Sequence, residues 1–278
     1  MWVIVMVIAL FLRFRQLVLA LLFCVLLANS PSYSQVACND TLKVALPNLP
    51  PYSIYVNDTG FGGQDVQLLN KVSEVSGCEL VFRPMPWKRG LKLLQQDKID
   101  VIIMASWRKK RTEFGQYTRP YRWETQLISA RKGFPALDRL TSMTSLVDEG
   151  FLIGSVRGAY HGEEFREVFE QGPGQRFVRE ITDYNQAVTL MQSYRIDGIV
   201  SDSGVLRYIS ENAGFDGYVF LDFPVFRNKV HLLLSKSVKK STLTALNIAL
   251  EKIMKTEGYS DIYGPENLIN TTDETVVN

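Results

Sequence analysis

The chain has 278 residues, of which 31 are Lys or Arg and 29 are Asp or Glu, for a formal net charge of +2. Residues 1–34 hold two of the arginines and no acid, so the rest of the chain balances 29 basic against 29 acidic residues. This balance argues against a surface for nucleic acid or an anionic membrane. With two histidines, three cysteines and no metal-site spacing, neither a metal nor a cofactor is expected.

Residues 1–34 have the parts of a secretory signal peptide. Arg13 and Arg15 precede an apolar run at 17–28, and small residues lead to a cleavage site before Gln35. The apolar run at 17–28 alone is too short to span a bilayer, but residues 1–28 together are long enough. An uncleaved anchor is therefore the alternative interpretation. We therefore predict export, a periplasmic location and a mature protein that is not membrane-embedded.

The next part of the sequence alternates strand and helix patterns. Short apolar runs predict strands, and apolar residues at helical spacing predict the helices between them. The predicted strands are 42–46, 80–82 and 101–104, and the predicted helices are 65–76 and 89–96. This order favours a parallel sheet covered by helices on both faces.

Cys38 and Cys78 form an even pair in a compartment that permits disulfides. Each lies just before a predicted strand, at 42–46 and 80–82, with one helix between them. If these strands are parallel neighbours, their starting ends lie side by side and allow a disulfide. Two independent buried thiols are the alternative.

The second half of the sequence repeats the pattern without repeating the residues. Strands are predicted at 151–156, 198–200 and 229–234, and helices at 163–169 and 185–194, before an amphipathic helix that carries Leu243, Leu246 and Leu250. Two α/β units and a returning C-terminal segment predict two lobes with two crossings, near 128–131 and 226–230. The expected division is 35–129 with 228–278 for one lobe and 130–227 for the other.

Motifs of enzyme chemistry are scarce. The sequence has no nucleophile elbow and no phosphate-binding loop that ends in Lys-Ser or Lys-Thr. The cluster His161–Glu164 is typical of a solvated helix start rather than a metal site. These absences favour binding over catalysis.

Several motifs resemble, in order, those of the family 3 extracellular solute-binding proteins, periplasmic receptors for polar amino acids. The resemblance covers residues 40–264, and its most specific block is Ala105-Ser106-Trp107-Arg108-Lys109-Lys110-Arg111, followed by Pro120-Tyr121. The segment from Arg195 to Asp202 is similar to the family's second-lobe strand that ends in an aspartate. The resemblance implies the two-lobed type II periplasmic-binding-protein fold, hinge closure on a small ligand, a monomer, and an ABC transporter permease or a sensor as partner.

Carried over by position, the resemblance implies a ligand site between the lobes. Arg111, assisted by the Ser106 hydroxyl, would hold a ligand carboxylate, because a guanidinium binds a carboxylate through two parallel hydrogen bonds. Asp202 would take an ammonium group. The other implied site residues are two aromatic walls and three members of a second-lobe loop: Tyr52, Trp87, Arg157, Gly158 and Tyr160.

The chain departs from the family pattern near this site. Leu46 and Pro47 stand where an acidic residue is common, and Gly158-Ala159-Tyr160 stands where the family tends to show a hydroxyl residue after the glycine. These changes favour a larger or aromatic ligand, or one with an extra acidic group. The alternatives to a transport receptor are a dehydratase-like enzyme, with Glu124 or Asp202 as general acid, and an orphan protein without a transport role.

Overall fold

The computed structural model describes residues 38–56, 60–212 and 217–269. The predicted signal peptide and its cleavage site lie outside these residues. All the described residues belong to one compact unit, 37–278. None of the described helices combines the length and apolar character that crossing a membrane requires.

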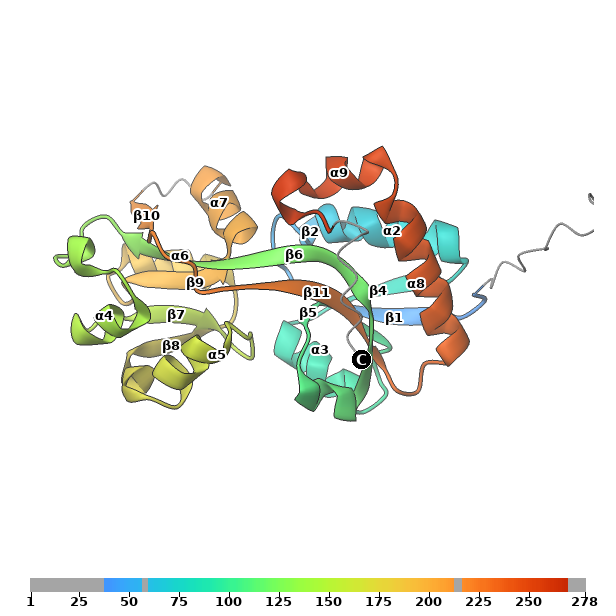
Figure 1. Cartoon of the computed structure of the whole chain (residues 1–278), viewed down its shortest axis with the longest axis horizontal. Coiled ribbons are helices and arrows are strands. Elements are labelled where there is room, and N and C mark those ends of the chain that lie inside the picture. The colour runs from blue at the N-terminus through green and yellow to red at the C-terminus, as the bar shows by residue number, and fades with distance from the viewer. Residues whose placement is uncertain (1–37, 57–59, 213–216, 270–278) are drawn as a thin grey trace, which may run out of the picture. The chain divides into compact units, whose positions relative to one another are not determined.

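A nine-stranded sheet organises the described residues (Figure 1), in the order β4-β1-β5-β11-β6-β9-β7-β8, with β10 paired to β6. Its strands are β1 (Thr41–Leu46), β4 (Glu79–Pro84), β5 (Val101–Ser106), β6 (Gly115–Arg131), β7 (Ile153–Val156), β8 (Val178–Ile181), β9 (Gly198–Asp202), β10 (Tyr218–Phe220) and β11 (Phe226–Ser235). A separate two-stranded sheet joins β2 (Ile54–Val56) and β3 (Gly60–Gly62).

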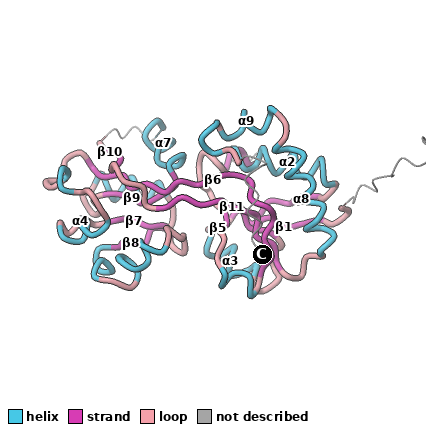
Figure 2. The backbone as a smooth tube through the Cα atoms, viewed as in Figure 1, coloured by secondary structure: helices cyan, strands magenta, loops and turns pink. Residues whose placement is uncertain are grey.

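The large sheet consists of two parallel blocks joined by antiparallel strands. β4, β1 and β5 are parallel, as are β9, β7 and β8. Between the blocks, β6 and β11 run antiparallel to each other and to their neighbours, side by side in Figure 2. We call the part with β4, β1 and β5 the first lobe and the part with β9, β7 and β8 the second lobe. The predicted two-lobed α/β fold is confirmed, whereas its exact division points stay a prediction.

Helices cover both faces of the sheet and bury apolar stripes against it. They are α2 (Gln64–Ser76), α3 (Trp87–Leu94), α4 (Met143–Asp148), α5 (Glu163–Phe165), α6 (Tyr184–Gln192), α7 (Ser203–Asn212), α8 (Lys240–Met254) and α9 (Glu257–Tyr263). Leu246, Leu250 and Ile253 of α8 are buried in the same cluster as Leu69 of α2. The helix predicted at 163–169 is α-helical only over α5 and continues as a π-helix.

The predicted disulfide between Cys38 and Cys78 is confirmed. Their Cα atoms lie 4.7 Å apart, and 40 positions of sequence separate them. The two cysteines precede β1 and β4, which are parallel neighbours with Thr41 opposite Glu79. The disulfide therefore fixes the start of both strands and the helix between them.

Candidate functional site

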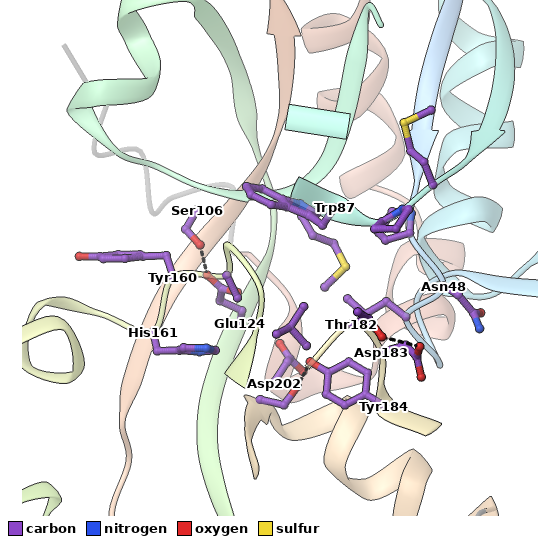
Figure 3. Close-up of a pocket in the computed structure, with 18 of the residues that line it drawn as sticks. Asn48, Trp87, Ser106, Glu124, Tyr160, His161, Thr182, Asp183, Tyr184 and Asp202 are labelled. Atoms are coloured by element: carbon purple, nitrogen blue, oxygen red, sulfur yellow. Dashed lines mark hydrogen bonds between the residues drawn. The ribbon is translucent and has the colours of Figure 1, made fainter. Parts of the chain in front are cut away.

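A cavity of about 620 Å³ opens between the lobes (Figure 3), a size in the range of small-molecule sites. Its lining combines ends of first-lobe strands, the middle of β6, and second-lobe residues at or after the ends of β7, β8 and β9. Five residues of the predicted site line it: Trp87, Ser106, Arg111, Tyr160 and Asp202. These residues come from both lobes, and the fold brings them together.

The other three residues of the predicted site lie outside the cavity lining. Tyr52 is 1% exposed and packs behind the cavity rather than forming its wall. Arg157 is turned toward the outer surface, where its Nε lies 2.7 Å from Glu180. Gly158 has a φ of +84° and packs against the side chain of Lys88. The structure therefore brings five of the eight predicted site residues to the cavity lining and places these three outside it.

Ser106 and Trp87 hold Arg111 at the cavity. It lies in the 3₁₀ turn Lys109–Glu113 that follows β5, and its Nη1 donates to the Ser106 carbonyl oxygen at 2.8 Å. Its guanidinium lies 4.7 Å from the ring centroid of Trp87. The indole is itself fixed, because its Nε1 donates to the Ile103 carbonyl oxygen at 3.1 Å.

Arg111 is 5% exposed, yet no ion pair among the described residues involves it. Burial lowers the pKa of Arg111, although an arginine keeps its charge at any physiological pH. Buried charges in proteins are normally paired. This guanidinium lines the cavity and is therefore available to form an ion pair with a bound anion.

Asp202, by contrast, has its partners inside the protein. Its carboxylate accepts a hydrogen bond from the Tyr52 hydroxyl at 2.5 Å and one from the Gly204 backbone at 2.9 Å. Arg122, in the middle of β6 and fully buried, places Nη1 3.3 Å from the same carboxylate. Burial raises the pKa of Tyr52 well above its ordinary value, so its hydroxyl remains a donor.

Glu124 and Gln126 were not predicted as binding residues, although both line the cavity. Glu124 accepts hydrogen bonds from the Ser106 hydroxyl at 2.5 Å and from the Gln126 amide at 3.3 Å. Figure 3 draws Glu124 between Ser106 and Asp202. Burial raises the pKa of Glu124 from 4.5 to about 7. The sequence signal that could have indicated them is their spacing, because Glu124 and Gln126 lie two residues apart and so face the same side of a strand.

His161 also lines the cavity. The predicted solvated helix start is correct for the exposed Glu163 and Glu164, where α5 begins, but not for His161, which is buried. Its side chain is 2% exposed and hydrogen-bonds to Ser155 at 2.9 Å and to Gln126 at 3.2 Å. Burial lowers the pKa of His161 to about 3, so the imidazole is neutral. No cluster of three potential metal ligands occurs in the described parts of the chain.

The remaining lining is largely apolar and aromatic. The first lobe contributes Met85 and Met104 beside Trp87, and the second lobe contributes Tyr160 and Tyr184. The Tyr160 ring packs against Phe226 with centroids 5.3 Å apart. Such a lining fits a ligand with a substantial apolar or aromatic portion next to its charged groups.

Comparisons with known proteins agree with this geometry. Residues 42–265 match the family described as bacterial extracellular solute-binding proteins, family 3. A probable histidine-binding protein of Neisseria gonorrhoeae is 24% identical over 207 residues, covering 72% of this chain and 73% of the relative. A probable histidine-binding protein of Campylobacter jejuni is 24% identical over 231 residues, covering 80% and 82%.

Among solved structures, an ancestral arginine-binding protein bound to arginine superposes with a TM-score of 0.69 at 25% identity. The match covers 80% of this chain and 96% of that protein. The family match spans more than half of the chain and includes both lobes. The chain therefore belongs to the bacterial extracellular solute-binding proteins of family 3.

Proposed function

We propose that this protein is a periplasmic receptor that binds a small carboxylate, of the amino-acid class, in the cavity between its lobes. The observation that carries the proposal is Arg111, a nearly buried guanidinium that lines the cavity without an acidic partner in the described residues. A ligand carboxylate there would receive charge-assisted hydrogen bonds in a water-poor site. The relatives named for histidine and arginine binding support an amino acid as the ligand class.

The proposed role is binding without turnover, as a monomer that passes its ligand to an ABC transporter permease or reports it to a sensor. Closure of the two lobes around the β6–β11 connection would enclose the ligand. The alternative, a dehydratase-like enzyme, would convert the bound acid by removing water from it. NMR spectra of each bound acid before and after incubation with the protein would reveal the dehydrated product.

The test is a thermal-shift screen of the protein against the twenty L-amino acids and small organic acids. A ligand at 100 times its Kd adds about 2.7 kcal/mol to the free energy of unfolding, which is readily measured. Arg111→Ala should weaken binding of each hit by more than about 100-fold, because it deletes one member of a buried charged pair.

The matched control is Arg139→Ala, which removes an exposed arginine paired with Glu149 away from the cavity. Its affinities should equal those of the unchanged protein. If no acid in the screen raises the melting temperature, the receptor role is refuted and the orphan alternative is favoured. If hits bind Arg111→Ala unchanged, the carboxylate site lies elsewhere.

A further inference from the structure

The cavity holds a second charged group besides Arg111, the carboxylate of Glu124. This side chain is 4% exposed and lines the cavity from β6. Its hydrogen bonds come from two neutral donors, the Ser106 hydroxyl and the Gln126 amide. Within the described chain it takes part in no ion pair. A buried carboxylate of this kind would gain from an added positive charge.

Arg111 and Glu124 both form hydrogen bonds with Ser106 but form no ion pair with each other. Arg111 binds the Ser106 carbonyl oxygen, and Glu124 binds the Ser106 hydroxyl. Both charged groups line the same cavity, and the charge of Glu124 acts on Arg111. The site thus offers complementary charges to a zwitterion.

Asp202 is less able to fill the same role. Arg122 already supplies a positive charge to its carboxylate, and Tyr52 and Gly204 occupy further acceptor positions. A ligand ammonium at Asp202 would have to share a carboxylate that Arg122 already contacts. Glu124 forms no ion pair with a described residue, although the charge of Arg122 acts on it from farther away.

We propose that Glu124, rather than Asp202, receives the cationic group of the ligand and makes the cavity selective for zwitterions over simple acids. This inference rests on the proposed carboxylate site at Arg111. It assigns Glu124 the discrimination between an amino acid and the corresponding hydroxy acid, which share size and carboxylate but differ in the ammonium group.

The groups around Glu124 determine its pKa and therefore how ligand binding depends on pH. It faces Ser106 of β5, Arg111 after β5, Arg122 and Gln126 of β6, and Asp202 of β9. Arg122 and Asp202 act on it with opposite signs, and the nearby His161 is neutral. Since burial raises the pKa of Glu124 to about 7, a bound ammonium group would lower it and release a proton. At pH 7 this amounts to about half a proton per ligand bound.

The experiment compares the tightest-binding L-amino acid of the screen with its 2-hydroxy analogue, by isothermal titration calorimetry at pH 7.5. The unchanged protein should bind the hydroxy acid about 10- to 100-fold more weakly, the usual scale for losing a hydrogen bond to a charged group. Glu124→Gln should lose that preference by weakening the amino acid alone. Titrations at pH 7 in two buffers of different ionisation enthalpy should show proton release in the unchanged protein, a readout that needs no variant.

The outcomes separate the two proposals. If Glu124→Gln binds both acids as the unchanged protein does and no proton is released, the role of Glu124 is refuted while the Arg111 site stands. If Asp202→Asn, with its fold verified by circular dichroism, abolishes the preference instead, Asp202 is the ammonium site. If neither acid series binds, or binding ignores Arg111→Ala, the receptor proposal fails and this inference fails with it.

Discussion

Arg122 Nη1 lies 3.3 Å from Oδ2 of Asp202, which joins β6 to the end of β9 through charges buried in the protein interior. On its other side, Nε of Arg122 lies 3.5 Å from Asp65 at the start of α2. The guanidinium stacks on the Tyr52 ring at 3.7 Å. Burial alone would lower the pKa of Arg122, but these neighbours raise it well above its ordinary value. One arginine thus forms ion pairs with a carboxylate from each lobe.

Arg122→Met should destabilise the protein by about 3–5 kcal/mol, because it leaves Asp65 and Asp202 buried without their cation. The loss should be smaller at pH 5 than at pH 8, since carboxylates without a cation can take up protons at the lower pH. Urea unfolding at both pH values measures this. Arg139→Ala, an exposed arginine, should change stability by less than about 1 kcal/mol. A loss below about 1 kcal/mol for Arg122→Met would show that Arg122 is not needed for stability.

Removing the disulfide should weaken the first lobe. In the chain-entropy model, closing the 40-residue loop between Cys38 and Cys78 contributes about 3–4 kcal/mol. The variant Cys38→Ala/Cys78→Ala should therefore unfold at a lower urea concentration by that free energy. Dithiothreitol should destabilise the unchanged protein and leave the double variant unaffected. Equal stability of the two proteins under oxidising conditions would contradict this.

The first-lobe strands and the disulfide could be predicted because local patterns determine them. β1, β4 and β5 contain the short apolar runs that predicted them, and parallel order of β1 and β4 then places Cys38 beside Cys78. The 17-residue strand β6 carries charged residues in its interior, among them Arg122 and Glu124. Their burial depends on partners from other segments, which periodicity along one segment does not reveal.

The same limit of local sequence patterns explains which site residues could be predicted and which could not. Ser106 and Asp202 end β5 and β9, and ligands of α/β sheets bind at such ends. Glu124 lies inside a strand that runs on through the cavity wall, so the strand-end rule does not find it. Arg157 follows β7, but the partner that orients it, Glu180 of the adjacent β8, is visible only in the fold.

Stability should depend on pH through Glu124. Its pKa is raised from 4.5 to about 7, so the folded protein holds this proton more tightly than the unfolded chain. The free energy of unfolding therefore falls as pH rises from about 4.5 to 7, by about 3 kcal/mol at most, and this loss is complete above pH 7.

Glu124→Gln removes this titration, so the variant should be about 1–3 kcal/mol more stable than the unchanged protein at pH 8 and nearly equal to it at pH 4.5. Urea denaturation at several pH values gives the difference. Glu180→Gln, which changes an exposed carboxylate, should show no such trend. A stability difference for Glu124→Gln that does not grow with pH would contradict the buried, ionising carboxylate described here.

Trp87 should report ligand binding through its fluorescence. Its indole lines the cavity, is partly exposed and lies 4.7 Å from the Arg111 guanidinium, so a bound carboxylate replaces water beside the ring. We expect its emission to shift to shorter wavelength on binding. Trp107 and Trp123 do not line the cavity, and Trp123 is covered by Arg227 at 4.6 Å.

Trp87→Phe should therefore abolish the fluorescence change, whereas Trp123→Phe should retain it. Affinity measured by calorimetry should fall only about 3- to 30-fold in Trp87→Phe, because phenylalanine keeps a weaker cation–π contact with Arg111 but loses the hydrogen bond to Ile103. A fluorescence change that persists in Trp87→Phe, or disappears in Trp123→Phe, would place the ligand away from the first-lobe wall. Since Trp87 and Arg111 contact each other, that result would also argue against the carboxylate site at Arg111.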